Sequence, residues 1–163
     1  MALSVVSPPF DSNTAGEIKG SSLSYPDHHD WFACSHEILR PMDKATGLAK
    51  SKRQHRPLVA TKRLDQATPL LQDTLTSNGT IPEIRFLFYR PSPAGVEEHF
   101  FTITLTEALI SRIVLEQLDN RYPENMPLEV VEHVSFVYGQ ITWEDVITGV
   151  TASDAWRSRR RAG

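Results

Sequence analysis

The chain has 163 residues, of which 40% are hydrophobic and 23% are charged, as in an ordinary soluble globular protein with one sizeable core. The formal net charge of −3 excludes a general attraction to nucleic acid or to acidic membranes. Cys34 is the single cysteine, which excludes an intrachain disulfide and a cysteine-based metal cage.

The first segment, "MALSVVSPPF", has neither a basic region nor a long apolar run, so we expect no secretory signal peptide and a chain that folds in the cytosol. No stretch approaches 18 apolar residues, so we expect no transmembrane helix. Pro8 and Pro9 stand side by side and cannot both lie in a central strand. Residues 1–15 are therefore predicted to be irregular, and "GEIKG" (Gly16–Gly20) is a short extended piece.

A polar loop precedes a predicted strand over Trp31–Leu39. The next segment, about 41–54, is long, polar and basic, and a structureless loop of this length is usually functional or disordered. "RPLVATK" follows as a strand.

A short α-helix is predicted over about Pro69–Ser77. Thr68 suits the N-cap, and Pro69 suits the first helical position, where a missing N–H costs nothing. Asn78 and Gly79 end the helix because both tolerate the left-handed conformation. A helix of about three turns is marginal alone and must dock on the β-structure.

Clear strands fill the second half of the chain. Glu83–Arg90 and the segment 97–105 alternate in polarity around the turn "PSPAG" and form a hairpin candidate. "LEVVEHVSFVYGQITWEDV" gives the longest strand signal, and Gly139 within it marks a bulge or bend that lets the strand serve two sheets.

These elements predict one mostly β domain over 1–163, a small antiparallel β-barrel of two sheets with one flanking short α-helix. Apolar residues on both faces of several strands leave one face for the core and another for a subunit interface. The Arg-rich tail, 157–163, is interpreted as a solvated terminus, with a contact to an acidic partner as the alternative.

No catalytic constellation stands out. "PDHHD" gathers Asp27, His28, His29 and Asp30, with His36 nearby, but adjacent histidines in a loop lack the spacing of a helical metal site. Cys34 and His36 on one strand face would lie about 7 Å apart, too far for a nucleophile–base hydrogen bond. The acidic pairs Glu97–Glu98 and Glu116–Asp119 are neighbours in sequence alone. We expect no enzyme, no cofactor and no metal, with a small metal-dependent β-barrel enzyme as the remote alternative.

Several motifs in order resemble the haemolysin-coregulated protein (Hcp) family, which forms the tube of the bacterial type VI secretion system. "GEIKG" is similar to the family's early G-x-I-K-G piece, and "HRPLVATKRLDQATPLL" to its strand-to-helix segment. "EVVEHVSFVYGQITWE" resembles its final strand, and "RPMDKATG" and "SDAW" resemble features of the longer members. The N-terminus departs from the family, whose members usually open with an apolar strand.

The resemblance implies a structural tube protein whose hexameric rings stack into an exported inner tube. It implies spike-tip and sheath proteins as partners and small effectors carried in the lumen, without nucleic acid or membrane insertion. It implies export from the cytoplasm through the type VI apparatus. A specialised ring protein dedicated to effector or spike docking is the alternative. The corresponding loop of the family reaches neighbouring subunits and rings, so the interface residues expected here are Asp43, Lys44, Lys50, Lys52 and Arg53.

Overall fold

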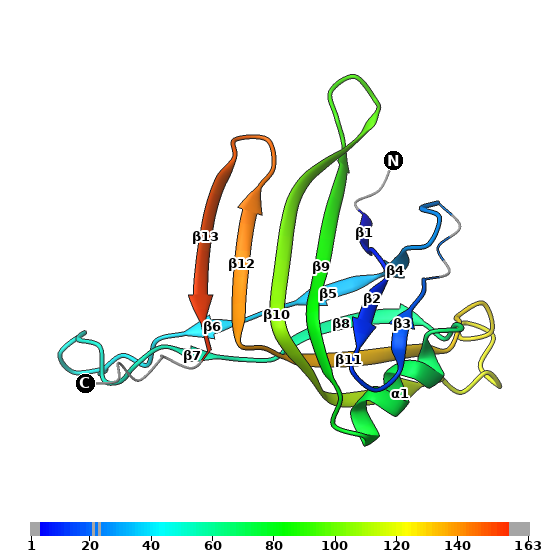
Figure 1. Ribbon diagram of the computed structural model, residues 1–163, viewed down its shortest axis with the longest axis horizontal. Coiled ribbons are helices and arrows are strands. Elements are labelled where there is room, and N and C mark those ends of the chain that lie inside the picture. The colour runs from blue at the N-terminus through cyan, green and yellow to red at the C-terminus, as the bar shows by residue number, and fades with distance from the viewer. Residues whose placement is uncertain (1–3, 21, 23, 157–163) are drawn as a thin grey trace.

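The computed structural model describes residues 4–20, 22 and 24–156, and it shows antiparallel strands along most of this chain with one helix among them (Figure 1). This confirms the predicted mostly β class. The first strands are β1 (Ser4–Ser7), β2 (Phe10–Ser12), β3 (Gly16–Ile18), β4 (His29–Trp31), β5 (Ala33–Ser35), β6 (Ile38–Leu39), β7 (Gln54–His55) and β8 (Leu58–Arg63). After the helix α1 (Thr68–Thr76) come β9 (Thr80–Pro91), β10 (Glu97–Glu116), β11 (Val131–Val137), β12 (Gln140–Asp145) and β13 (Val150–Ala155).

Strand β10 organises the main sheet, because its 20 residues pair with β9 and β12 along the first half and with β11 along the second. The chain bends between the halves at Glu107, whose φ is 51°. Opposite this bend, Gly139 separates β11 from β12 and donates its N–H to the carbonyl of Thr106 at 2.9 Å. The bend predicted at Gly139 is confirmed. It lets β9, β10, β12 and β13 form one layer, across which β5, β8 and β11 run behind (Figure 1).

The paired strands form an open path from β4 through β1, β9, β10, β11 and β8 to β5. Within the described residues the pairs therefore do not form the closed β-barrel that the sequence predicted. The two end strands are consecutive in the chain and meet at Phe32, whose N–H donates to the carbonyl of Thr61 at 2.7 Å. A kink here directs β4 to β1 and β5 to β8, so the single strand predicted over Trp31–Leu39 is also wrong.

Residues 4–7 and 10–12 form strands, so the prediction of an irregular segment is wrong over this part of 1–15, while residues 1–3 lie outside the described residues. β1 lies between β4 and β9, with Val5 opposite Phe88, and β2 pairs with β3. Burial explains the order, because Val6 and Phe10 are only 1% and 6% exposed. Pro8 and Pro9 connect the two strands, where no ladder hydrogen bond is required of them.

The core lies between the two layers and is centred on three aromatic rings. Trp31 packs edge-on against Phe86 and Phe136, with ring centroids 5.5 and 6.2 Å away, and the two phenylalanines lie 5.8 Å apart. All three side chains are buried. This geometry is the favourable one for aromatic pairs, and it fixes how the layers meet.

The helix begins one residue earlier than predicted, and Thr68 is not its N-cap. Ala67 takes that position, and its N–H is satisfied by the Asp65 carboxylate at 2.8 Å. The Thr68 hydroxyl accepts the Asp65 N–H at 3.1 Å and donates to Glu132 on β11 at 2.8 Å. Pro69 lies in the first turn, where its missing N–H costs nothing, as expected.

At the other end of the helix, Asn78 and Gly79 act by different mechanisms. Asn78 has the predicted left-handed conformation, with φ of 55°. Gly79 does not share it. A Cβ at Gly79 would lie 2.6 Å from Oγ1 of Thr14 and 3.0 Å from Oδ1 of Asn13, so this glycine permits close packing rather than a turn.

A buried ionic cluster ties the helix to the main sheet. The Lys62 ammonium lies 2.7 Å from the Glu132 carboxylate and 2.6 Å from that of Asp65, and the Lys62 and Glu132 side chains are at most 1% exposed. Charges can be buried in this way because they are paired and hydrogen-bonded. Together with the buried Leu71 and Ala67, the cluster explains why the chain has a helix here: α1 closes one end of the core.

Candidate functional site

The segment predicted as a long loop is a hairpin that extends from the end of the molecule (Figure 1). We name residues 38–55 the extended hairpin. β6 and β7 pair at its base, and a bridge joins Met42 to Ala49 near its tip. Asp43 organises the turn, since its carboxylate accepts the N–H groups of Ala45 and Thr46, each at 2.9 Å. These backbone hydrogen bonds, that of Thr46 first, hold the pKa of Asp43 below its usual value.

The predicted interface residues of this hairpin divide into two groups. Lys44, Lys50 and Lys52 are exposed, as a contact surface requires. The Asp43 carboxylate is instead occupied by the backbone hydrogen bonds that stabilise the turn. Arg53 lies at the base of the hairpin, where its guanidinium makes a bidentate ion pair with Asp154 near the end of β13.

A buried hydrogen-bond relay continues from this ion pair into the molecule. His55 Nε2 lies 2.9 Å from the Asp154 carboxylate, and His55 Nδ1 lies 2.9 Å from the Tyr138 hydroxyl. The same hydroxyl is 2.6 Å from His36 Nε2. Because a phenol has one proton, Tyr138 donates to one imidazole and accepts from the other. The rings of Trp143 and Trp156 pack against the relay.

The pKa values along the relay reflect both its ion pair and its burial. The Arg53 guanidinium, ahead of His55, holds the pKa of Asp154 below its usual value. Burial, followed by the neighbouring His55, lowers the pKa of His36, and burial raises the pKa of Tyr138. The relay is therefore a hydrogen-bonded network at the root of the hairpin, and it fixes the hairpin to the β12–β13 layer.

Sequence reasoning did not find this relay. Its members come from four distant segments, and the signals available, "HRP" and "SDAW", were interpreted only as family motifs. The Cys34–His36 pair considered earlier makes no hydrogen bond, because His36 bonds Tyr138 instead. Burial raises the pKa of the Cys34 thiol to about 11, so this side chain stays protonated and packs against the core.

The residues of the metal hypothesis do not converge. His29 is fully buried and its Nε2 lies 3.2 Å from the Ile18 carbonyl, whereas His28 Nδ1 lies 2.9 Å from the Pro26 carbonyl. Burial lowers the pKa of His29 to about 4. Across residues 4–20, 22 and 24–156, no three His, Cys, Asp or Glu side chains come together in a group that could hold a metal ion.

The paired carboxylates of the sequence are occupied by separate partners. Glu97 accepts hydrogen bonds from Ser4 and Tyr25, and Glu98 pairs with Arg90. On the other side of the molecule, Glu116 lies 2.9 Å from His133 Nε2 and Asp119 pairs with Arg121. The arrangement does not bring two carboxylates to one reaction centre.

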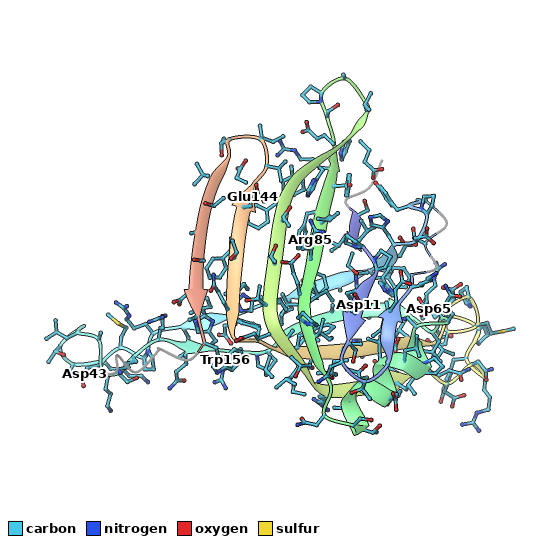
Figure 2. The ribbon with its side chains drawn as sticks, in the orientation of Figure 1. Asp11, Asp43, Asp65, Arg85, Glu144 and Trp156 are labelled. Atoms are coloured by element: carbon cyan, nitrogen blue, oxygen red, sulfur yellow. The ribbon has the colours of Figure 1, made fainter. Side chains whose placement is uncertain are left out.

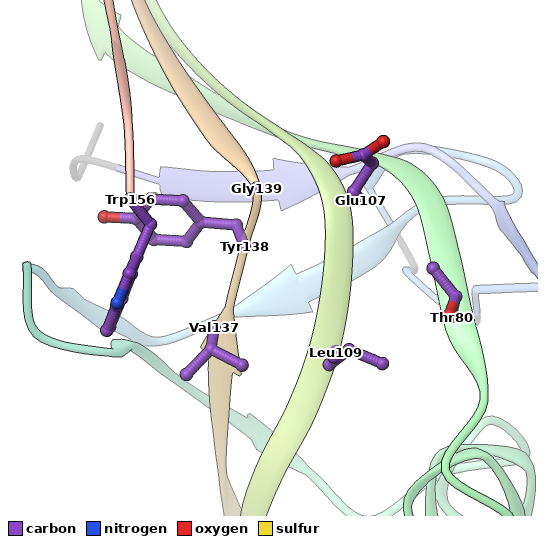
Figure 3. Close-up of a pocket in the computed structure, with 7 residues that line it drawn as sticks. All are labelled: Thr80, Glu107, Leu109, Val137, Tyr138, Gly139 and Trp156. Atoms are coloured by element: carbon purple, nitrogen blue, oxygen red, sulfur yellow. The ribbon is translucent and has the colours of Figure 1, made fainter. Parts of the chain in front are cut away.

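A pocket of about 480 Å³ opens beside the bend of β10 (Figure 3). Its walls are the apolar Leu109 and Val137 and the rings of Tyr138 and Trp156, with the Glu107 carboxylate on one side. Glu107 is so close that a Cβ on Gly139 would lie 2.5 Å from its Oε2. One carboxylate among apolar walls suits the binding of a side chain and supplies no nucleophile–base pair.

Two further surfaces of the front layer are open. The face turned away from the core is mostly polar, and we name it the polar face. Its rows are Arg85, Thr104, Thr142 and Ser153, then Leu87, Thr102, Glu144 and Thr151, and of these Thr102 is buried. Figure 2 shows Arg85 and Glu144 over this layer. The outer edge of β13 is the second surface. β13 pairs with β12 alone among the described strands, and the first four of its residues are exposed.

The described residues contain no helix long and apolar enough to cross a membrane.

Comparison with known proteins assigns the family. Residues 12–144 match the family model described as "Type VI secretion system effector, Hcp". The chain belongs to the Hcp family. The "Major exported protein" of Pseudomonas aeruginosa is 37% identical to it over 124 residues, which cover 76% of this chain and 72% of that relative.

Solved Hcp structures share the fold. The crystal structure of an Hcp protein superposes with a TM-score of 0.88 at 26% identity, covering 96% of this chain and 99% of the other. The secreted protein Hcp3 of Pseudomonas aeruginosa gives a TM-score of 0.79 at 27% identity, covering 96% of this chain and 100% of Hcp3. Hcp membership confirms the resemblance that the motifs indicated and the function it implied, that of a tube protein of the type VI secretion system. Hcp proteins are structural secreted proteins.

Proposed function

We propose that copies of this chain close into a homomeric ring, expected to be a hexamer, and that the rings stack into a tube exported through the type VI apparatus. The open outer edge of β13 is the observation that carries this proposal. A free edge of six residues is a template for pairing with other chains, and natural proteins cover or block such edges. A ring covers every edge with the next copy, which a monomer cannot do.

The exposed apolar residues at the same end of β12 and β13 support an interface there. Ile147 and Val150 are 57% and 66% exposed, and Val146 is 37% exposed. Apolar side chains gathered beside a free strand edge suit burial against a second subunit. The edge strand β13 carries one charged residue, Asp154, so two copies of the same chain can meet along it with little repulsion between like charges.

In this assembly the extended hairpin acts between rings. Its lysines are exposed and its base is fixed by the relay, so it projects as a rigid arm rather than as a disordered loop. The spike-tip and sheath proteins of the apparatus are the further partners that the proposal includes. The single-domain organisation over 1–163 remains part of the proposal, as does the cytoplasmic origin of the exported chain.

Carriage of small effectors is the second function that we propose. The polar face supports it, because rows of threonine and serine hydroxyls can form hydrogen bonds with a folded cargo protein. Such a polar surface binds the cargo less strongly than an apolar surface would, so the cargo can be released. This proposal requires the polar face to line the lumen of the ring.

Export is tested in a bacterium with an active type VI system that lacks its own tube protein. The full chain, supplied from a plasmid, should appear in the culture medium, and it should stay in the cells when the sheath is also deleted. A chain found only in the cell pellet of the sheath-positive strain would contradict the proposal.

Ring closure through β13 is tested with Val150→Lys combined with Ala152→Lys. Lysines on a strand edge oppose edge-to-edge pairing, so the variant should be a folded monomer by light scattering and circular dichroism. The matched control, Val150→Thr, keeps a β-branched side chain and should keep the mass of the ring. A lysine variant with an intact ring would show that another surface closes it.

A further inference from the structure

The pocket beside the bend of β10 has walls that suit a flat cation, and we name it the bend pocket. Figure 3 shows the rings of Tyr138 and Trp156 on one side and Glu107 on the other. The two ring centroids lie 5.1 Å apart, and the ring planes are 81° from each other. An arginine guanidinium can stack on such a ring and donate two hydrogen bonds to a carboxylate. The chemistry of the bend pocket therefore fits an arginine side chain.

Glu107 brings to the pocket a negative charge that the described residues do not neutralise. Its carboxylate is exposed, and it makes no hydrogen bond or ion pair within the described part of the chain. Its backbone is fixed, because the Gly139 N–H donates to the Glu107 carbonyl at 3.2 Å and to that of Thr106 at 2.9 Å. A carboxylate held in place beside aromatic walls favours an incoming cation.

The last described residue of the chain lies directly at this carboxylate. The Trp156 N–H donates to the Gly139 carbonyl at 2.9 Å, and a Cβ on Gly139 would lie 2.5 Å from Oε2 of Glu107. Gly139 therefore bridges Trp156 and Glu107. The segment that follows Trp156 begins at the bend pocket, and closing so short a loop onto Glu107 costs little chain entropy.

The sequence after Trp156 supplies the cation. Residues 157–163, "RSRRRAG", lie outside the described residues, and we name them the arginine tail. Four of these seven residues are arginines and none is acidic, whereas the whole chain has a net charge of −3, so the rest of the chain attracts the tail. The tail also lies beyond the part of the chain that matches the family model, which ends at residue 144.

We propose that the arginine tail binds the bend pocket of its own chain, with one guanidinium between the Glu107 carboxylate and the rings of Tyr138 and Trp156. This contact belongs to the single chain and goes beyond the proposed ring and tube, which it does not require. The docked tail covers Trp156, whose ring also packs against His55 of the relay with centroids 5.6 Å apart. The tail thus supports the root of the extended hairpin.

Disulfide trapping in the full chain tests this docking. The chain carries Cys34→Ser to remove the native thiol, Ser158→Cys among the arginines of the tail, and Leu109→Cys in the wall of the pocket. Mild oxidation should join positions 109 and 158 within one chain, which mass spectrometry of the unreduced peptides detects. A covalent dimer on a non-reducing gel would instead assign the pocket to the tail of another copy and overturn the proposal.

The matched control replaces Leu109→Cys with Lys52→Cys. Position 52 is exposed and lies beside the start of the tail, because the neighbouring Arg53 guanidinium donates to the Ala155 carbonyl at 3.4 Å. A tail without a docking site would reach this position as readily as the pocket. The yield with Leu109→Cys should exceed that of the control by about fivefold or more, since docking raises the effective concentration of the tail at the pocket. Equal yields would overturn the proposal.

Substitutions in the pocket and in the tail test the chemistry of the contact. Glu107→Gln keeps the volume and removes the charge, so it should lower the yield between positions 109 and 158 by about threefold or more. Replacing the four arginines by serine should lower it to the level of the Lys52→Cys control, and replacing them by lysine should have an intermediate effect. Circular dichroism confirms that each variant is folded. A yield that none of these changes alters would overturn the proposal.

Fluorine NMR gives a second measure without any added cysteine. In a chain labelled with 5-fluorotryptophan, the resonance of Trp156 is identified by its loss in Trp156→Phe. Replacing the tail arginines by serine should shift this resonance and leave that of the buried Trp31 in place. Glu107→Gln should shift the Trp156 resonance in the same direction. A Trp156 resonance that does not respond to the loss of the arginines would contradict docking against its ring.

Discussion

Replacement of Lys62 by methionine should be among the most damaging single changes to the fold. The Lys62 ammonium lies 2.7 Å from Glu132 and 2.6 Å from Asp65, and the Glu132 side chain is 0% exposed. Lys62→Met fills a similar volume but leaves the Glu132 carboxylate buried without its counter-charge. Breaking a buried pair from one side costs about 3–5 kcal/mol of unfolding free energy. For a chain of this length that corresponds to a fall in Tm of roughly 6–20 °C.

Urea unfolding at one fixed protein concentration measures this cost, because assembly also contributes to stability. Arg85→Met is the matched control: Arg85 lies 3.3 Å from Glu83, but both side chains are more than half exposed, and the loss should be about 0–1 kcal/mol. Combining Lys62→Met with Glu132→Leu should cost less than Lys62→Met alone, since no buried charge then remains between them. A loss for Lys62→Met within about 1 kcal/mol of the control would refute the assignment of this cluster as the attachment of the helix.

Three further predictions concern stability. Thr68→Val should lower the unfolding free energy by about 1–2 kcal/mol, because Glu132 loses a hydroxyl donor, and Thr68→Ser should retain most of it in thermal unfolding. Gly79→Ala should cost about 1–3 kcal/mol, since its Cβ would press on Thr14, while Asn78→Gly should be nearly neutral; equal effects of the two in urea would contradict the packing argument. Burial lowers the pKa of His29 to about 4, so the folded state disfavours its proton, and stability that is complete above pH ~6.5 is lost as the pH falls toward 4. About 2 kcal/mol should be lost by pH 5, and urea titrations of His29→Gln at pH 7 and 5 should show a smaller loss than those of the parent chain; equal losses would exclude His29 as the cause.

Local patterns predicted the parts of the fold that depend on local physics. Alternation identified most of β9 and the first half of β10, proline and asparagine bounded the helix, and Gly139 marked the bend between β11 and β12. Each of these signals acts through the backbone of the residue itself or of its near neighbours. The order of the motifs along the chain was then sufficient to identify the family.

The errors arose where partners are distant in sequence. β1 is a short strand beside two prolines, and it is ordered by pairing with β9, about 80 positions away in the chain. Thr68 was placed at the cap because Ser and Thr favour that site, but Glu132 competes for its hydroxyl across the core. The relay from Arg53 to His36 joins segments about 100 residues apart, which no local pattern encodes. The expected roles of Lys44, Lys50 and Lys52 in an interface remain predictions.

The solution mass of the unmodified chain, measured by light scattering across micromolar concentrations, tests the central claim most directly. One chain has a mass of 18.4 kDa, and the account predicts a single closed species of about six times that mass, ~110 kDa. A monomer at every concentration would contradict it.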